Sequence, residues 1–357
     1  MIKTRGNVMK KFFTLAAALA LPCSVLTIPL TTTSYAAEVD GPVVKWNASI
    51  WGKRRSASEG IEGLISTVKE KTGGKFDITL HYGGALSKPK ENLDGLQLGA
   101  FEMGMFCSAY HPGKTPALTV LDLPMIPYTD MKQQERVAEA VYQHPHVKKE
   151  MNRWNSQLIM TALLPTYVFM GRGEPPVEIE DWKGRKVRAL GGMGEAMKLL
   201  GAVPTAVTAP EVYTALERGT LDSVAFALYA HQAYGIIPVA QWYTDNFVIG
   251  TIHCGVAANN KAFNELPKQY QDLMLGVAKA NGYDQARAAF ANDDINVIEN
   301  IKKQGLTKVT YSHEKLAKFQ TQAARPVWDA WVKKQSEKGV PAQEILDLVL
   351  SLSGPGK

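Results

Sequence analysis

The chain has 357 residues, a formal net charge of +6 and a hydrophobic fraction of 45%. This composition is typical of a globular protein and excludes a disordered or fibrous chain. Four of the excess positive charges lie in the first eleven residues, so the rest of the chain is only slightly basic. That balance argues against a nucleic-acid binder, which would need a clustered basic face.

The N-terminal segment has the order of a secretory signal peptide. Basic residues come first, an apolar run follows from Phe12 to about Leu30, and small residues then form a cleavage site. We therefore expect residues 1–37 to be a signal peptide that is cleaved after Ala36 or Ala37. The mature protein, of roughly 320 residues, is then periplasmic and long enough for two lobes of ordinary domain size.

Two other interpretations of this segment are disfavoured. An uncleaved membrane anchor would need an uninterrupted apolar span, and Pro22 and Pro29 interrupt the run. A lipid anchor on Cys23 would need a small residue directly before it, and Pro22 occupies that position.

The mature chain opens with alternating strands and helices. Alternating apolar residues predict strands at 43–49, 76–82 and 102–106, and helical spacing predicts helices from Ser56 to the stop at Lys71 and over 90–98. Further along, the patterns predict strands at 158–164, 186–190 and 223–226 and helices at 194–200 and 211–218, with long helices after Pro267.

This order predicts an α/β fold with mainly parallel sheets flanked by helices. In such sheets ligands bind beyond the carboxyl ends of the strands. The candidate site is therefore formed by the loops that follow Ser49, Phe106, Leu164, Arg188 and Phe226.

Catalytic and cofactor motifs do not appear in the sequence. There is no G-x-S-x-G, Walker, H-E-x-x-H or complete Rossmann pattern, so we expect no enzyme, no cofactor and no metal. His144-x-His146 is a weak metal candidate in a polar loop, and the glycines of Gly191–Gly194 lack the spacing of a phosphate-binding loop. Cys107 and Cys254 form neither a zinc pattern nor a disulfide framework; they are able to pair in an oxidising compartment, but two small buried thiols are the favoured interpretation.

Several local strings resemble TRAP transporter solute-binding proteins of the DctP type. The most specific are D-x-x-G-x-K-x-R at 181–188, G-A-x-P at 201–204 and E-V-Y-x-A-L-x-x-G-x-x-D at 211–222, which occur in the family's order and spacing. VKEKTGGK at 68–75 and LDLP at 121–124 also match, and the resemblance reaches to about Leu348.

The resemblance implies a two-lobed periplasmic-binding-protein fold with a ligand cleft between the lobes and long C-terminal helices. It implies a first lobe of 38–165 with about 250–293, a second lobe of 166–249 with about 294–348, and a tail of 349–357. Such a protein captures a small organic acid by hinge closure and delivers it to membrane permease subunits driven by an ion gradient; we expect a monomer. The arginine of K-x-R, here Arg188, would hold the carboxylate, because a guanidinium pairs with carboxylates in a bidentate manner.

The sequence departs from the family at positions that line the cleft. Some members carry a second arginine where this chain has Val168, and the usual asparagine after the E-V-Y helix is Phe226. Buried polar ligand groups without partners are costly, so a sugar acid is disfavoured and a monocarboxylate with an apolar or aromatic body is favoured.

Other candidate ligand-binding residues lie near the predicted loops. Each aromatic residue has core packing as its alternative role. Arg54 and Arg55 are either two solvated surface charges or the source of a second anion clamp, and a clamp from this pair would restore a dicarboxylate or sulfonate as ligand. The candidates besides Arg188 are Trp51, Arg55, Phe106, Ser108, Tyr110, Tyr167, Thr208, Phe226, Tyr229 and Asn246.

Three rival functions remain open at this point. A binding protein of an ATP-driven transporter would share the architecture, and a sensing subunit of a membrane receptor would share the cleft chemistry. A secreted α/β enzyme is disfavoured because no nucleophile or metal motif is present.

Overall fold

The computed structural model describes residues 38–357. The signal peptide predicted for residues 1–37 lies outside this described part of the chain. Among the helices of residues 38–357, none combines the length and the apolar character that a membrane crossing requires.

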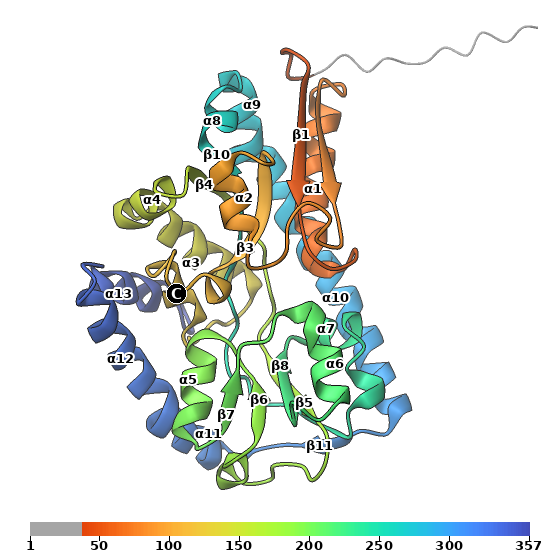
Figure 1. The fold of residues 1–357 in the computed structure, drawn as a ribbon, viewed down its shortest axis with the longest axis vertical. Coiled ribbons are helices and arrows are strands. Elements are labelled where there is room, and N and C mark those ends of the chain that lie inside the picture. The colour runs from red at the N-terminus through yellow and green to blue at the C-terminus, as the bar shows by residue number, and fades with distance from the viewer. Residues whose placement is uncertain (1–37) are drawn as a thin grey trace, which may run out of the picture. The chain divides into compact units, whose positions relative to one another are not determined.

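The first of two sheets has five strands in the order β2-β1-β3-β10-β4, and Figure 1 labels β1, β3, β4 and β10. Its strands are β1 (Val44–Ser49), β2 (Phe76–His81), β3 (Met103–Cys107), β4 (Ser156–Thr161) and β10 (Cys254–Asn259). β1 pairs in parallel with β2 and β3, whereas β10 runs antiparallel to β3 and β4. We call this sheet and the helices on it the first lobe; they include α1 (Ser56–Lys71), α2 (Asn92–Leu98), α3 (Met131–Gln143), α4 (Pro145–Asn152), α8 (Asn260–Asn264) and α9 (Lys268–Leu273).

The second sheet has six strands in the order β11-β9-β5-β8-β6-β7. Its strands are β5 (Val168–Gly171), β6 (Lys186–Arg188), β7 (Val203–Thr205), β8 (Ser223–Phe226), β9 (Trp242–Thr244) and β11 (Thr307–Val309). β6 pairs in parallel with β7 and β8, and β5 is antiparallel to β8 and β9. This sheet, with α5 (Gly191–Leu199), α6 (Val212–Glu217), α7 (Leu228–Ala233) and α11 (His313–Phe319), is called the second lobe.

Long C-terminal helices connect the two lobes. α10 (Lys279–Gln304) packs on α1 of the first lobe and on α7 of the second, and Figure 1 shows it running along both. α12 (Arg325–Ser336) contacts α5, and α13 (Ala342–Leu352) contacts α3. Gln133 of α3 exchanges two hydrogen bonds with the backbone of Gly354, which fixes the end of the chain on the first lobe.

The two-lobed α/β fold and the long C-terminal helices are confirmed. The sheets contain more antiparallel pairs than expected, since β10 and β5 run antiparallel to their neighbours. Each of these two strands follows a connection from the other lobe and therefore enters its sheet from the opposite direction. The sequence patterns missed β5, β7, β9, β10 and β11, which are short or, as in β10, composed of small residues without alternation.

Cys107 and Cys254 are joined by a disulfide. They end β3 and begin β10, and they lie directly opposite each other in the antiparallel pair. The favoured interpretation as two free buried thiols is therefore wrong, although both residues are buried. A pairing across 147 residues depends on strand order, which local sequence patterns do not contain.

Candidate functional site

A narrow cavity lies between the lobes; its volume of about 20 Å³ is far below the ~300–1,000 Å³ usual for small-molecule sites, so the lobes are closed with little free space between them. The first lobe and the connections between the lobes contribute Trp51, Arg55, Met105, Cys107, Tyr110, Leu164, Ile252 and Cys254. The second lobe contributes Tyr167, Arg188, Ala209, Phe226, Tyr229, Ala230 and Tyr234. Lining from both sides is the arrangement that a binding cleft requires.

Arg188 is the charged group that the second lobe contributes. It ends β6, beside β8, and its side chain is fully buried. Its Nε donates to the carbonyl of Val207 at 3.2 Å and one Nη donates to the carbonyl of Ala225 at 2.8 Å. The other Nη is buried and has no hydrogen-bond partner among the described residues. The backbone therefore orients the guanidinium and leaves one strong donor uncommitted.

The ring of Phe226 lies against this guanidinium. The Cζ of Arg188 is 4.3 Å from the ring centroid, within the range of a cation–π interaction. Tyr234 stacks on the same ring at 5.5 Å, and Tyr167 meets it edge-on at 6.1 Å. The residue that replaces the family's asparagine thus supports the arginine through its π-face.

Arg55 is the charged group that the first lobe contributes, and Arg54 is not. Arg54 is an exposed partner of Glu59 at 2.7 Å, whereas Arg55 turns inward and donates to the carbonyls of Trp51 and Lys53. The Cζ of Arg55 lies 5.8 Å from the ring centroid of Tyr234 in the second lobe, and its Nε is buried without a partner in the described structure.

Gly52 makes the approach of Arg55 and Tyr234 possible. Its φ of +73° belongs to the left-handed region, and a Cβ there would lie 2.9 Å from the Arg55 guanidinium and 3.1 Å from the Tyr234 hydroxyl. A side chain at position 52 would therefore push apart the two groups that meet across the lobes.

Tyrosines form much of the remaining wall. The hydroxyl of Tyr110, from the first lobe, accepts a hydrogen bond from the backbone N–H of Ala209 in the second lobe at 3.0 Å. Burial raises the pKa of Tyr110, Tyr167 and Tyr229, so all three phenols are neutral at physiological pH. They offer hydroxyl groups to a ligand without adding charge.

The electrostatic balance of the cavity is positive. Among the described residues that line it there is no carboxylate, and both charged groups are guanidiniums. His231, which packs against Phe226, is also neutral, because burial lowers its pKa to about 3. The cavity therefore suits a solute that carries negative charge.

Seven predicted site residues are brought together in the cavity, and four are not. Those that line it are Trp51, Arg55, Tyr110, Tyr167, Arg188, Phe226 and Tyr229. Those outside its lining are Phe106, Ser108, Thr208 and Asn246.

Strand alternation explains the positions of Phe106 and Ser108. Met105 and Cys107 of β3 face the cavity, so Phe106 points to the opposite face, where it packs near His253. The Ser108 hydroxyl donates to the carboxyl of Asp122 at 2.8 Å and is fully buried.

The polar groups of Thr208 and Asn246 are used in structural hydrogen bonds. Thr208 pairs with Glu211 in a capping box at the start of the helical turn at 209–211. The Asn246 amide exchanges two hydrogen bonds with the backbone of Tyr311, at 2.7 and 2.9 Å. Neither side chain is directed to the cavity.

Some lining residues were missed, and part of the signal was present in the sequence. Period-two alternation along β3 would have selected Met105 and Cys107 in place of Phe106. The i, i+4 spacing of Ala230 and Tyr234 would have extended the site along α7. Ile252 had no such signal, because it lies in an irregular connection between β9 and β10.

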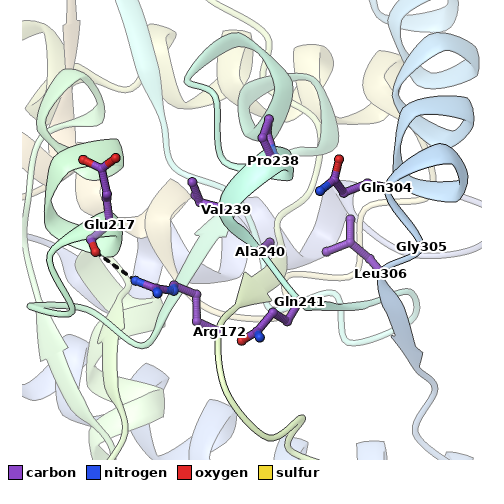
Figure 2. A pocket seen from close by; sticks show the side chains of 9 residues that line it. All are labelled: Arg172, Glu217, Pro238, Val239, Ala240, Gln241, Gln304, Gly305 and Leu306. Atoms are coloured by element: carbon purple, nitrogen blue, oxygen red, sulfur yellow. Dashed lines mark hydrogen bonds between the residues drawn. The ribbon is translucent and has the colours of Figure 1, made fainter.

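A more open depression on the second lobe shows a different chemistry (Figure 2). Arg172 is its charged residue, and one Nη donates to the carbonyls of Leu216 and Glu217 at the end of α6. This guanidinium therefore caps a helix C-terminus and has a structural role. Arg188 differs from it, because its second Nη has no such partner within residues 38–357.

The two weak sequence candidates for ion binding have structural explanations. His144 caps α4 by accepting from the backbone N–H of His146, and its other ring nitrogen lies 3.1 Å from Glu344. Gly191 and Gly192 at the start of α5 lie directly against Asp122 and Pro124, so protein atoms occupy the space where a phosphate would have to bind. Within residues 38–357, no three His, Cys, Asp or Glu side chains are grouped as metal ligands would be.

Two α/β lobes that line one small, positively charged cavity define the chain as a solute-binding protein of the periplasmic type. The chain belongs to the DctP family, bacterial extracellular solute-binding protein family 7, whose model matches residues 48–335. The resemblance to TRAP transporter solute-binding proteins is thereby confirmed, and with it a role in transport.

A relative in sequence agrees with this assignment, and two solved structures share the fold. A monocarboxylate 2-oxoacid-binding periplasmic protein of Nostoc sp. is 29% identical over 72% of this chain and 71% of its own length. A TRAP solute-binding protein of Rhodoferax ferrireducens, solved with copurified benzoate, superimposes with a TM-score of 0.78 at 18% identity, covering 87% of this chain and 97% of the other. One of Sulfitobacter sp., solved with β-D-galacturonate, gives 0.74 at 19% identity over 86% and 99%.

Proposed function

We propose that this chain captures a small monocarboxylate with an apolar or aromatic body. The observation that carries the proposal is the uncommitted, buried Nη of Arg188, held in place by two backbone carbonyls beside an aromatic wall. A buried charged donor without a partner is costly, and a carboxylate would satisfy it.

The remaining wall favours an apolar ligand body over a hydroxylated one. Phe226, Leu164 and Ile252 have no hydrogen-bonding side-chain group, Trp51 is only a donor and Met105 only a weak acceptor. The tyrosine hydroxyls are the neutral polar side-chain partners beside this apolar part of the wall, and each sugar hydroxyl buried out of their reach would cost about 1–3 kcal/mol.

Capture proceeds by closure of the lobes on the acid. Contacts across the lobes, such as Tyr110 to the backbone of Ala209 and Arg55 over Tyr234, favour the closed arrangement. The acid adds an ion pair that is strong only when water is excluded, so it shifts the population toward the closed state. The closed protein, a periplasmic monomer that catalyses no reaction, then delivers the acid to an ion-gradient-driven permease.

A second candidate ligand is a dicarboxylate or a sulfonate. It is favoured by one observation, the inward position of Arg55 with its buried, unpartnered Nε. Two guanidiniums and no carboxylate would match a second anionic group.

The ligands named for the similar proteins include an aromatic acid and a hydroxylated sugar acid. The Nostoc relative is named for monocarboxylate 2-oxoacids, and the Rhodoferax structure holds benzoate, in line with the first candidate. The Sulfitobacter structure holds a sugar acid, which marks the range that the fold accommodates.

Thermal unfolding of the mature protein with a panel of acids tests the proposal. The panel is benzoate, phenylpyruvate, succinate and galacturonate. The stabilisation by each acid grows with the ratio of its concentration to its Kd. Benzoate or phenylpyruvate should give the largest shift, and NMR of the mixture should show no product. A larger shift with succinate would favour the second candidate, and no shift with any acid would remove the proposal.

A further inference from the structure

The first-lobe wall of the cavity contains a disulfide. Cys107 and Cys254 both line the cavity, and each is only 1% exposed. They lie directly opposite each other at the end of β3 and the start of β10, so the bond closes the antiparallel pair at its edge toward the ligand.

The disulfide stands between two segments that carry other lining groups. Cys107 leads into the turn at 108–110, whose Tyr110 lines the cavity and reaches the backbone of Ala209 in the second lobe. Cys254 follows Ile252, which also lines the cavity and belongs to the connection that arrives from β9. The bond therefore fixes the connection between the lobes to the strand that positions Tyr110.

We infer that the Cys107–Cys254 disulfide is a determinant of ligand affinity, because it holds Tyr110 and Ile252 at the spacing that the bound acid needs. The inference rests on the proposed function, since it concerns the same cavity. Reduction by a dithiol breaks the sulfur–sulfur bond, gives each cysteine one electron and one proton, and leaves the reductant as a disulfide. After reduction the two sulfur atoms are no longer bonded and repel each other at the length of a sulfur–sulfur bond. The strand ends or the cysteine side chains therefore move at the cavity wall.

Thermodynamic linkage makes this effect reciprocal. If reduction weakens binding by a given factor, bound acid must make the disulfide harder to reduce by the same factor. Both sulfur atoms also lie in buried side chains, so closure over the acid keeps a reductant away from them. Bound acid should therefore hinder reduction of the disulfide, and reduction should weaken binding of the acid.

The test measures the Kd of benzoate by calorimetry for the oxidised protein and for the protein kept in dithiothreitol. If benzoate does not bind, the best acid of the panel above replaces it. We expect reduction to weaken binding about tenfold, within the ~5–150-fold range of coupled sites. In the reverse arm, saturating benzoate should raise the dithiothreitol concentration needed for half reduction.

Variants separate this effect from general destabilisation. Cys107→Ser/Cys254→Ser should bind benzoate as weakly as the reduced protein does. Should that pair or the reduced protein unfold, Cys107→Val/Cys254→Ala keeps buried apolar volume and takes its place. Val137→Ala, in the first-lobe core on α3 and outside the cavity lining, should lower the unfolding temperature and leave the Kd unchanged.

The outcomes distinguish this inference from the function on which it rests. Equal Kd values for oxidised and reduced protein, with an unchanged midpoint of reduction, would overturn the inference and leave the acid-binding function standing. Failure of the oxidised protein to bind any acid of the panel would remove the function, and the inference with it.

Discussion

Replacing Arg188 by methionine tests the site at its centre. The substitution removes the buried charge and its free Nη while it keeps an apolar side chain of similar length beside Phe226. Truncating one partner of a buried, hydrogen-bonded charge pair costs about 2–5 kcal/mol, much of it from the other charge left unpaired. At about 1.4 kcal/mol per factor of ten, benzoate should bind roughly 30- to 4,000-fold more weakly.

The stability of the ligand-free protein should change much less. The carbonyls of Val207 and Ala225 lose their donors, at about 1–3 kcal/mol each, but a buried charge without an ionic partner is also removed. Calorimetry with benzoate gives the affinity, and urea unfolding without ligand gives the stability. The matched control is Arg172→Met, whose guanidinium caps α6 outside the cavity and should leave the affinity unchanged. An unaltered Kd in Arg188→Met would refute the assignment of the anion clamp.

Three further predictions follow from the charges of the site and of the first lobe. The affinity for benzoate should stay constant between about pH 5 and 9, because burial lowers the pKa of His231 to about 3 and raises the pKa of Tyr110, Tyr167 and Tyr229; a titration step in calorimetry within that range would contradict this. Arg55→Met should weaken succinate at least about tenfold more than benzoate if Arg55 pairs with a second carboxylate, and equal losses for the two acids would exclude that role. Burial raises the pKa of Asp122 from 3.8 to about 7, so its stabilising contribution is complete below pH 3.8 and is lost as the pH rises through 7. Asp122→Asn should therefore raise the free energy of unfolding at pH ~9 by on the order of 4 kcal/mol and change it little at pH ~4, measured by urea unfolding, with Asp329→Asn at an exposed position as the matched control.

The parts of the fold that local periodicity encodes were predictable. The opening strands and helices up to β3 follow alternation and helical spacing closely, as does β8 at Ser223–Phe226. Strands of three residues, such as β7, β9 and β11, carry too little pattern, and their pairing partners lie far away in sequence. Their assignment needs the tertiary structure.

The site was predictable where a motif or a loop position identified it. Arg188 came from the K-x-R motif and Tyr110, Tyr167 and Tyr229 from loops at strand ends, and all of them line the cavity. Phe106 was chosen by loop position alone, although alternation along β3 turns it away. The cysteine pair depended on the neighbourhood of β3 and β10, which no local signal predicts.

The departures from the family pattern share one feature. The cationic side chain of Arg188 keeps its place in the cavity, and the side chains that line the rest of the cavity differ. Arg188 is oriented by backbone carbonyls, which any sequence supplies, so its position does not depend on the side chains that changed. Phe226, in place of an asparagine, removes a polar ligand contact yet supports the guanidinium through its ring at 4.3 Å. Val168, in place of a second arginine, is buried in β5, while Arg55 brings a guanidinium to the cavity from the opposite lobe. Under the proposed function, loss of polar groups on the second lobe would change which ligand body fits and would leave intact the charge that attracts the acid.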